Sequence, residues 1–187
     1  GMFALVRKYA PDMEIHISTQ SGIVNYLTAN EFYKRGAKRV VLARELSFED
    51  IIKIRQNTPK DLEIECFVHG AMCVSCSGRC VLANCLVGRD SNRGDGAQPC
   101  RWQYYVMEEK REGMYLPIME TERGTFVFNS KDMCMIEHID DLFKCGAASI
   151  KIEGRIKTAY YVATVVKSYR AAIDAYMANP DDWYKEY

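Results

Sequence analysis

Residues 65–101 read ECFVHGAMCVSCSGRCVLANCLVGRDSNRGDGAQPCR, and they decide most of what this chain can be. The segment begins as a hydrophobic strand that ends at His69 and Gly70. Five of the eight cysteines of the chain follow within 28 residues. Thiolates gathered among glycines usually serve metal or redox chemistry, which a hydrophobic core does not need. These five are Cys73, Cys76, Cys80, Cys85 and Cys100.

On the N-terminal side of this segment, short apolar runs alternate with helical patterns. Ser47 begins one helix, because its hydroxyl precedes an acidic residue at Asp50 in the spacing of a helix cap. Each strand–helix step spans about 20–25 residues, which is typical of βα units in a parallel sheet or barrel. The expected elements are strand 14–18, helix 23–35, strand 39–43, helix 48–56 and strand 62–68.

On the C-terminal side, the strand–helix rhythm stops after His69 and later returns. Residues 71–101 show no period and predict a long irregular loop, which inside a compact domain is usually functional or disordered. The sequence therefore predicts one α/β domain over residues 1–187, with a Cys-rich loop and a small antiparallel meander inserted at residues 71–134. The meander strands are expected at 103–109, 114–120 and 124–129, and the returning elements are helix 136–144, strand 149–153 and helix 159–177.

The composition sets limits on partners and compartment. Lys and Arg together number 25, as do Asp and Glu, so a nucleic-acid site has to be a local patch. No apolar run approaches the roughly 20 residues that cross a bilayer, and no secretory signal is apparent. We therefore expect a cytoplasmic protein with reduced thiols and no membrane partner; a disulfide framework is the alternative.

The cysteine spacing favours a cluster over a zinc finger. Iron–sulfur clusters and structural zinc both use about four soft sulfur ligands. Structural zinc prefers tight pairs with two residues between the cysteines, and only Cys73 and Cys76 form such a pair among the candidates. The wider spacing of Cys80, Cys100 and Cys134 favours an iron–sulfur cluster, while zinc or unrelated free thiols remain alternatives. The cysteines expected to pack in the core instead are Cys66 and Cys145.

Several charged residues near strand ends are candidates for chemistry. His69, Glu45 and Glu153 lie at or near the ends of predicted strands, where barrel enzymes carry their catalytic groups. A hydrogen-bonded or salt-bridged structural role is the alternative for each. A thiol protease built from His69 with Cys73 or Cys66 is less favoured, because a cysteine that binds metal cannot also be the nucleophile.

Basic residues gather around the same predicted edge. With Trp102 and the neighbouring tyrosines, they predict a surface that holds a phosphate backbone and stacks a base. A scattered, solvated basic face is the alternative. The candidate substrate-binding residues are Arg93, Arg101, Lys151 and Arg155.

The motifs of the chain resemble those of the collagenase-like peptidase family U32. The match begins at Glu65 and Phe67 and continues through His69-Gly70 and the cysteines that follow. It covers nearly the whole chain. The other matching stretches are Cys73, Ser77-Gly78, Cys80, 18–20, Asn25, 39–45, 88–94, 98–102, 129–134 and 151–155.

The resemblance implies a fold and two kinds of activity, and a degenerate fragment without catalysis is the alternative to both. The fold is a barrel of the TIM type, of which this chain would form the second half with four parallel βα units. Some relatives are described as collagenases. Others resemble accessory factors for oxygen-independent hydroxylation of tRNA, ribosomal RNA or ubiquinone, with a 4Fe–4S cluster and, for the RNA factors, prephenate as the hydroxyl source. A half barrel implies self-association or pairing with an N-terminal half.

The resemblance also assigns residues. Three cluster ligands fall on Cys73, Cys80 and Cys134. At the usual fourth position this chain has Gly96, so Cys100 is the expected substitute. The proposed acid–base residues are His69, Glu45 and Glu153, and substrate positioning is expected of Arg93, Arg101, Lys151 and Arg155.

Overall fold

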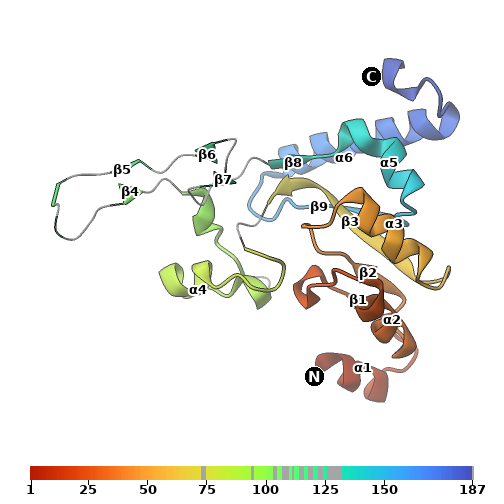
Figure 1. The fold of residues 1–187 in the computed structure, drawn as a ribbon, viewed down its shortest axis with the longest axis horizontal. Coiled ribbons are helices and arrows are strands. Elements are labelled where there is room, and N and C mark those ends of the chain that lie inside the picture. Colours follow the sequence, from red (N-terminus) through yellow and green to blue (C-terminus); the bar gives the residue numbers. More distant parts are fainter. Residues whose placement is uncertain are drawn as a thin grey trace.

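The computed structural model describes residues 1–72, 75–93, 95–102, 105–106, 110, 112–113, 116–117, 120–121, 124–125 and 132–186. Its centre is a five-stranded sheet (Figure 1). Four strands are parallel, in the order β1, β2, β3 and β9, and β8 runs antiparallel to the end of β3. The predicted α/β class is therefore confirmed. The strands are β1 (His16–Ile17), β2 (Arg39–Val41), β3 (Glu63–Ala71), β8 (Asp132–Cys134) and β9 (Ser149–Ile152).

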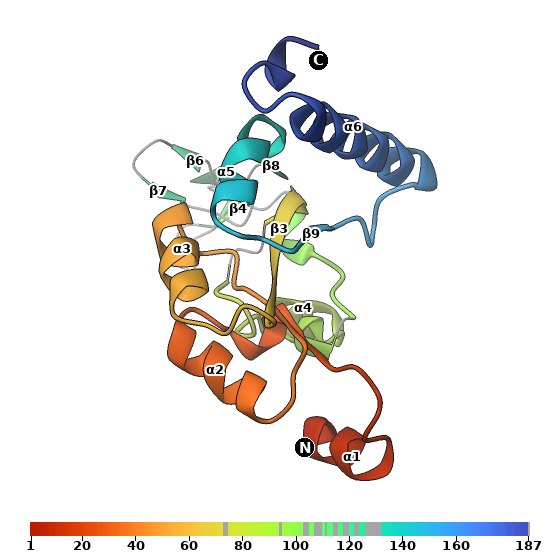
Figure 2. The same ribbon diagram turned by 90° about the vertical axis from the view of Figure 1, so that its right-hand side faces the viewer.

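The main helices follow or precede the parallel strands, and α2, α3, α5 and α6 pack against one another in chain order (Figure 2). Side-chain oxygens cap three of them, because the first N–H groups of a helix lack partners within it. Asn25 accepts from the Thr28 N–H at 2.9 Å, and Ser47 accepts from the Asp50 N–H at 3.3 Å. Thr158 caps the last long helix. The helices are α1 (Met2–Tyr9), α2 (Tyr26–Lys34), α3 (Phe48–Gln56), α5 (Ile139–Lys144) and α6 (Ala159–Ala178).

The hydrophobic core lies between the sheet and these helices. Val40, Ile64 and Val68 from β2 and β3 are fully buried in it. Cys66 and Cys145 are also buried, as the sequence predicts. Burial raises the pKa of the Cys66 thiol to about 12, so this thiol stays protonated and packs as a small apolar side chain.

The predicted elements are confirmed where their signals are local. The helix capped by Ser47 spans Phe48–Gln56, as expected, and the last helix differs from its prediction by one residue. β3 runs three residues beyond the predicted end at Val68, because β8 pairs with this extension. The segment predicted to be irregular contains α4 (Leu82–Val87), and neither β8 nor α1 was expected.

The predicted meander appears as two small antiparallel pairs. β4 (Tyr105–Val106) pairs with β5 (Leu116–Pro117), and β6 (Glu120–Thr121) pairs with β7 (Gly124–Thr125). Residues 103–104, 107–109, 114–115, 118–119 and 126–129 of the predicted strands lie outside the described part of the chain. The half barrel and the division into one domain with an inserted loop and meander at 71–134 remain predictions. None of the helices formed by described residues has the length and apolar character needed to cross a lipid bilayer.

Candidate functional site at the strand ends

A pocket of about 100 Å³ lies where the parallel strands end. Gln20 follows β1, Arg44 follows β2, Ala71 ends β3 and Glu153 follows β9, and all four line the pocket. The rest of the wall is formed by Met72, Arg155 and residues of 75–102, here called the cysteine segment. In α/β folds, ligands bind at this carboxyl edge of the strands.

Two of the four predicted metal ligands share this pocket. Cys80 is half-buried, Cys100 is buried, and both line it. Cys73 lies outside the described residues, although its neighbour Met72 lines the pocket. Cys134 is exposed on β8 and is not a lining residue. Within the described residues, no three His, Cys, Asp or Glu side chains are grouped closely enough to hold a metal ion.

His69 lies beside Cys134 and faces helix α6. The two residues are opposite one another in the β3–β8 pairing. The His69 ring nitrogens contact the hydroxyls of Tyr161 at 3.0 Å and Tyr169 at 3.5 Å. Burial lowers the pKa of His69, although the nearby Asp132 carboxylate opposes this change. Its contacts thus connect the end of β3 to α6, and His69 does not line the pocket that contains Cys80 and Cys100.

The glycine after His69 permits a close approach between two strand ends. Gly70 has φ of +107°, and a Cβ atom there would overlap the carbonyl oxygen of Glu153. The β3–β9 register also shifts between Phe67 and His69. Glycine is the residue that allows both the backbone angle and this contact.

Glu45 fixes the cysteine segment to the sheet. Its two carboxylate oxygens accept hydrogen bonds from the Ser77 N–H at 2.5 Å and the Ser77 hydroxyl at 3.0 Å. The Thr19 hydroxyl, after β1, lies 3.4 Å from the Ser77 hydroxyl. A Cβ atom at Gly78, whose φ is +76°, would overlap the Gln20 carbonyl oxygen. Glu45, predicted as an acid–base group, therefore contacts the backbone that leads to Cys80.

The remaining predicted residues have different surroundings. Glu153 accepts hydrogen bonds from the Arg155 N–H at 3.0 Å and from Gln98 Nε2 at 3.4 Å. The Arg155 guanidinium lines the pocket and makes no ion pair with a described residue. Arg93 is exposed and pairs with Asp90 at 3.4 Å. Arg101 ends a short 3-10 turn, and its side chain lies outside the described part.

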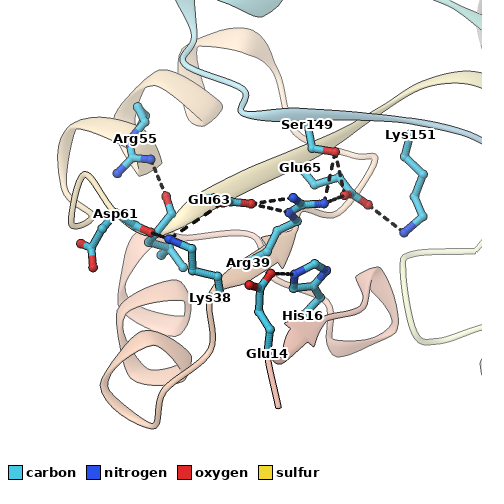
Figure 3. Close-up of polar contacts among 11 residues, drawn as sticks. Glu14, His16, Lys38, Arg39, Arg55, Asp61, Glu63, Glu65, Ser149 and Lys151 are labelled. Carbon is cyan, nitrogen blue, oxygen red and sulfur yellow. Dashed lines mark hydrogen bonds and ion pairs between the residues drawn. The ribbon is translucent and has the colours of Figure 1, made fainter. Parts of the chain in front are cut away.

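Lys151 belongs to a polar cluster on the sheet (Figure 3). The buried Glu65 carboxylate accepts hydrogen bonds from Lys151 at 2.8 Å, Ser149 at 2.9 Å and Arg39 at 3.0 Å. Arg39 also pairs with Glu63 at 2.6 Å. Burial alone would raise the pKa of Glu65, but these donors outweigh it and hold the pKa below its ordinary value. The cluster connects β2, β3 and β9.

Comparison with known proteins shows to which family the chain belongs. The model of Peptidase family U32 matches residues 1–187. The chain belongs to this family. It is 39% identical to "tRNA hydroxylation protein P" of Escherichia coli over 93% of the chain and 47% of the relative. It is 43% identical to "tRNA hydroxylation protein P1" of Bacillus subtilis over 95% of the chain and 41% of the relative.

The U32 relatives include a second kind of protein. The chain is 36% identical to "Collagenase" of Porphyromonas gingivalis over 88% of the chain and 40% of that relative. It spans less than half the length of these three relatives. No solved structure matches. Family membership is therefore shown, while the names of the relatives point to two different activities.

Sequence reasoning missed Gln20 and Gln98 as lining residues of the U32 site. Both glutamines lie in stretches that match the family motifs, 18–20 and 98–102, but neither was singled out as a site residue. The position of Gln20 against the cysteine segment arises only from the tertiary fold.

Proposed function

We propose that this U32 protein takes part in the hydroxylation of RNA, and that its cysteines hold a 4Fe–4S cluster at the strand ends. The supporting observation is the similarity to proteins named for tRNA hydroxylation, at 39% and 43% identity over more than nine-tenths of the chain. Because the chain spans less than half of these proteins, the activity of the whole relative is part of the proposal.

The thiols that are described fit such a group in part. Cys80 and Cys100 line one pocket, and Cys73 directly follows the lining residue Met72. Cys134 is proposed as the fourth ligand. The donor set is soft sulfur, which suits an iron–sulfur cluster or zinc and not magnesium or calcium. When bound, a cluster would supply one-electron chemistry.

The protein side chains would then bind and orient the substrate. We assign the phosphate contacts of the RNA to Arg93 and Arg101, because guanidinium groups bind phosphate oxygens. A small hydroxyl donor such as prephenate is part of the same proposal. Glu45 would hold the cysteine segment in place through Ser77.

Metal and sulfide analysis after anaerobic purification tests the cofactor. We expect about four iron and four sulfide per chain, with absorbance near ~400 nm. Cys80→Ala and Cys100→Ala should each lose most of the iron. Cys85→Ala is the matched control, because Cys85 is exposed on α4 and does not line the pocket. Full retention of iron in Cys80→Ala would overturn the cluster site.

The RNA activity has its own test. The chain is expressed in a bacterium whose tRNA hydroxylation protein has been deleted, and tRNA nucleosides are measured by mass spectrometry. We expect nucleosides that gain one oxygen atom, and loss of that gain in Cys80→Ala.

We also propose self-association or an N-terminal partner that completes the sheet. Light scattering after size-exclusion chromatography checks this, and a stable monomer in both the absence and presence of the partner would contradict it.

The peptidase alternative rests on the collagenase relative and on Cys134 lying opposite His69. A cysteine peptidase needs a thiolate that its histidine activates. The His69 nitrogens contact tyrosine hydroxyls instead, and the pKa of the Cys66 thiol is about 12. Gelatin cleavage that survives chelation and is abolished by Cys134→Ala would favour the peptidase.

A further inference from the structure

The pocket contains a buried hydrogen-bond acceptor without a partner. Gln98 Oε1 is buried and accepts no hydrogen bond. Turning the amide over would not help, because Nε2 donates to the Glu153 carboxylate at 3.4 Å and an oxygen in its place would face another oxygen. Buried polar atoms are nearly always paired in proteins, so an unpaired one indicates a missing donor.

The backbone at Gln98 is held in an unfavourable conformation. Its φ is +53°, and it is the one non-glycine residue with positive φ in the described part of the chain. The following residue is Pro99, which disfavours helical backbone angles in its predecessor. Residues kept in such conformations cluster at ligand sites, because the surrounding fold imposes the geometry there. Here the conformation directs the side chain into the pocket wall.

The side chain of Arg155, an exposed residue, lies in the same wall. The Arg155 guanidinium makes no ion pair with a described residue, and both oxygens of Glu153 already accept from other donors. The guanidinium lies beside the Gly96 backbone, where a Cβ atom would be 3.4 Å from Arg155 Nη1 and 2.9 Å from the Ser91 hydroxyl. With Arg44, the pocket carries two guanidinium groups against one carboxylate, a net charge of +1.

We propose that this pocket binds a small hydroxycarboxylate. The carboxylate would bind the Arg155 guanidinium, and the hydroxyl would donate to Gln98 Oε1. An anion that also carries a hydroxyl donor would pair with both groups at once. The volume of about 100 Å³ limits the acid to two or three carbons. This inference concerns the polar wall of the pocket in the chain without a cluster, because the ligand would lie beside Cys80 and Cys100.

Calorimetry on the whole reduced, metal-free chain tests the charge. Glycolate is the probe. We expect Arg155→Gln to weaken glycolate binding at least tenfold, because it removes the charged hydrogen bonds. Arg79→Gln is the matched control, since Arg79 is exposed on the cysteine segment and does not line this pocket. It should change the affinity less than twofold. Equal glycolate affinity in wild type and Arg155→Gln would overturn the proposal.

A second comparison tests the acceptor. Acetate lacks the hydroxyl and should bind wild type about tenfold more weakly than glycolate. Gln98→Leu should remove this difference while acetate still binds. A difference that persists in Gln98→Leu would contradict the role of Gln98, as would a buried water that satisfies it. Binding of phosphate without any binding of glycolate would overturn the carboxylate assignment. Circular dichroism confirms folding of each variant, and iron content does not enter this measurement.

Discussion

The parallel sheet and the cysteine segment are stabilised in different ways. The sheet carries a core of fully buried aliphatic side chains, and its polar cluster at Glu65 is formed by residues of three strands. Among the described residues of 75–102, the buried apolar side chains are only Ala83, Pro99 and Cys100. The segment is fixed instead by Ser77 against Glu45 and by the close approach of Gly78 to Gln20.

The difference indicates that the sheet determines the stability of the chain and the cysteine segment determines the reactivity of its thiols. Apolar burial is the main favourable term in folding, so the sheet should set the free energy of unfolding of the chain. A segment with few buried contacts opens locally at a lower free energy than global unfolding. Changes in the sheet should therefore alter stability, and changes in the cysteine segment should alter the exposure of thiols. Three pairs of variants test this contrast.

The largest effect is expected at a glycine of the sheet. Gly70→Ala places a Cβ atom onto the Glu153 carbonyl at an unfavourable φ, so strand ends must separate. We expect the free energy of unfolding to fall by about 3 kcal/mol in urea titration. Gly88→Ala is the matched control in the cysteine segment, with φ of +68° but no atom within 4 Å of the Cβ position. It should cost about 1 kcal/mol or less. Equal losses would mean that the two regions do not differ.

The polar cluster of the sheet should give the next largest effect. Glu65→Gln removes the buried negative charge that Arg39 and Lys151 share. Both cations are partly exposed, so we expect a loss of about 2 kcal/mol, less than for a fully buried pair. Glu31→Gln, which breaks an exposed pair with Arg35, should cost about 0.5 kcal/mol. Urea titration at pH 7 measures both.

The same variant has a defined pH dependence. The folded-state pKa of Glu65 lies below its ordinary value of 4.5, so its ionised form stabilises the folded chain above that pH. This contribution is lost as the pH falls through the folded pKa. The difference in stability between wild type and Glu65→Gln should therefore shrink as the pH falls below about 4.5. A constant difference down to pH 3 would contradict the assignment.

The sequence predicted the sheet better than the cysteine segment, for a physical reason. The caps at Ser47 and the apolar runs of β2 and β9 are local signals, and these elements formed where expected. β8 has no strong signal of its own, because it exists by pairing with the end of β3. α4 is a six-residue helix inside a segment with no clear period. Tertiary contacts decide such elements.

The candidate site shows the same division. Thiol spacing predicted that Cys80 and Cys100 belong together, and they line one pocket. It did not predict that Glu45 would bond to Ser77, because the two residues are 32 positions apart in the chain. The unpaired Gln98 oxygen is likewise a property of the folded pocket.

Of the three sites tested against a control, Glu45 should show the smallest and most local effect. Glu45→Gln keeps one acceptor for Ser77 but presents an NH₂ group in place of the second carboxylate oxygen. Loss of one exposed charged hydrogen bond is worth about 1 kcal/mol, which is about a fivefold increase in the open population of the segment. We expect alkylation of Cys80 to become about fivefold faster while the exposed Cys76 reacts as before. Mass spectrometry of iodoacetamide-treated protein measures both rates, and Glu31→Gln is the control. Two outcomes would contradict this role: alkylation of Cys80 at the wild-type rate, or a fall in melting temperature as large as in Glu65→Gln. In either case Glu45 would not be the residue that holds the cysteine segment.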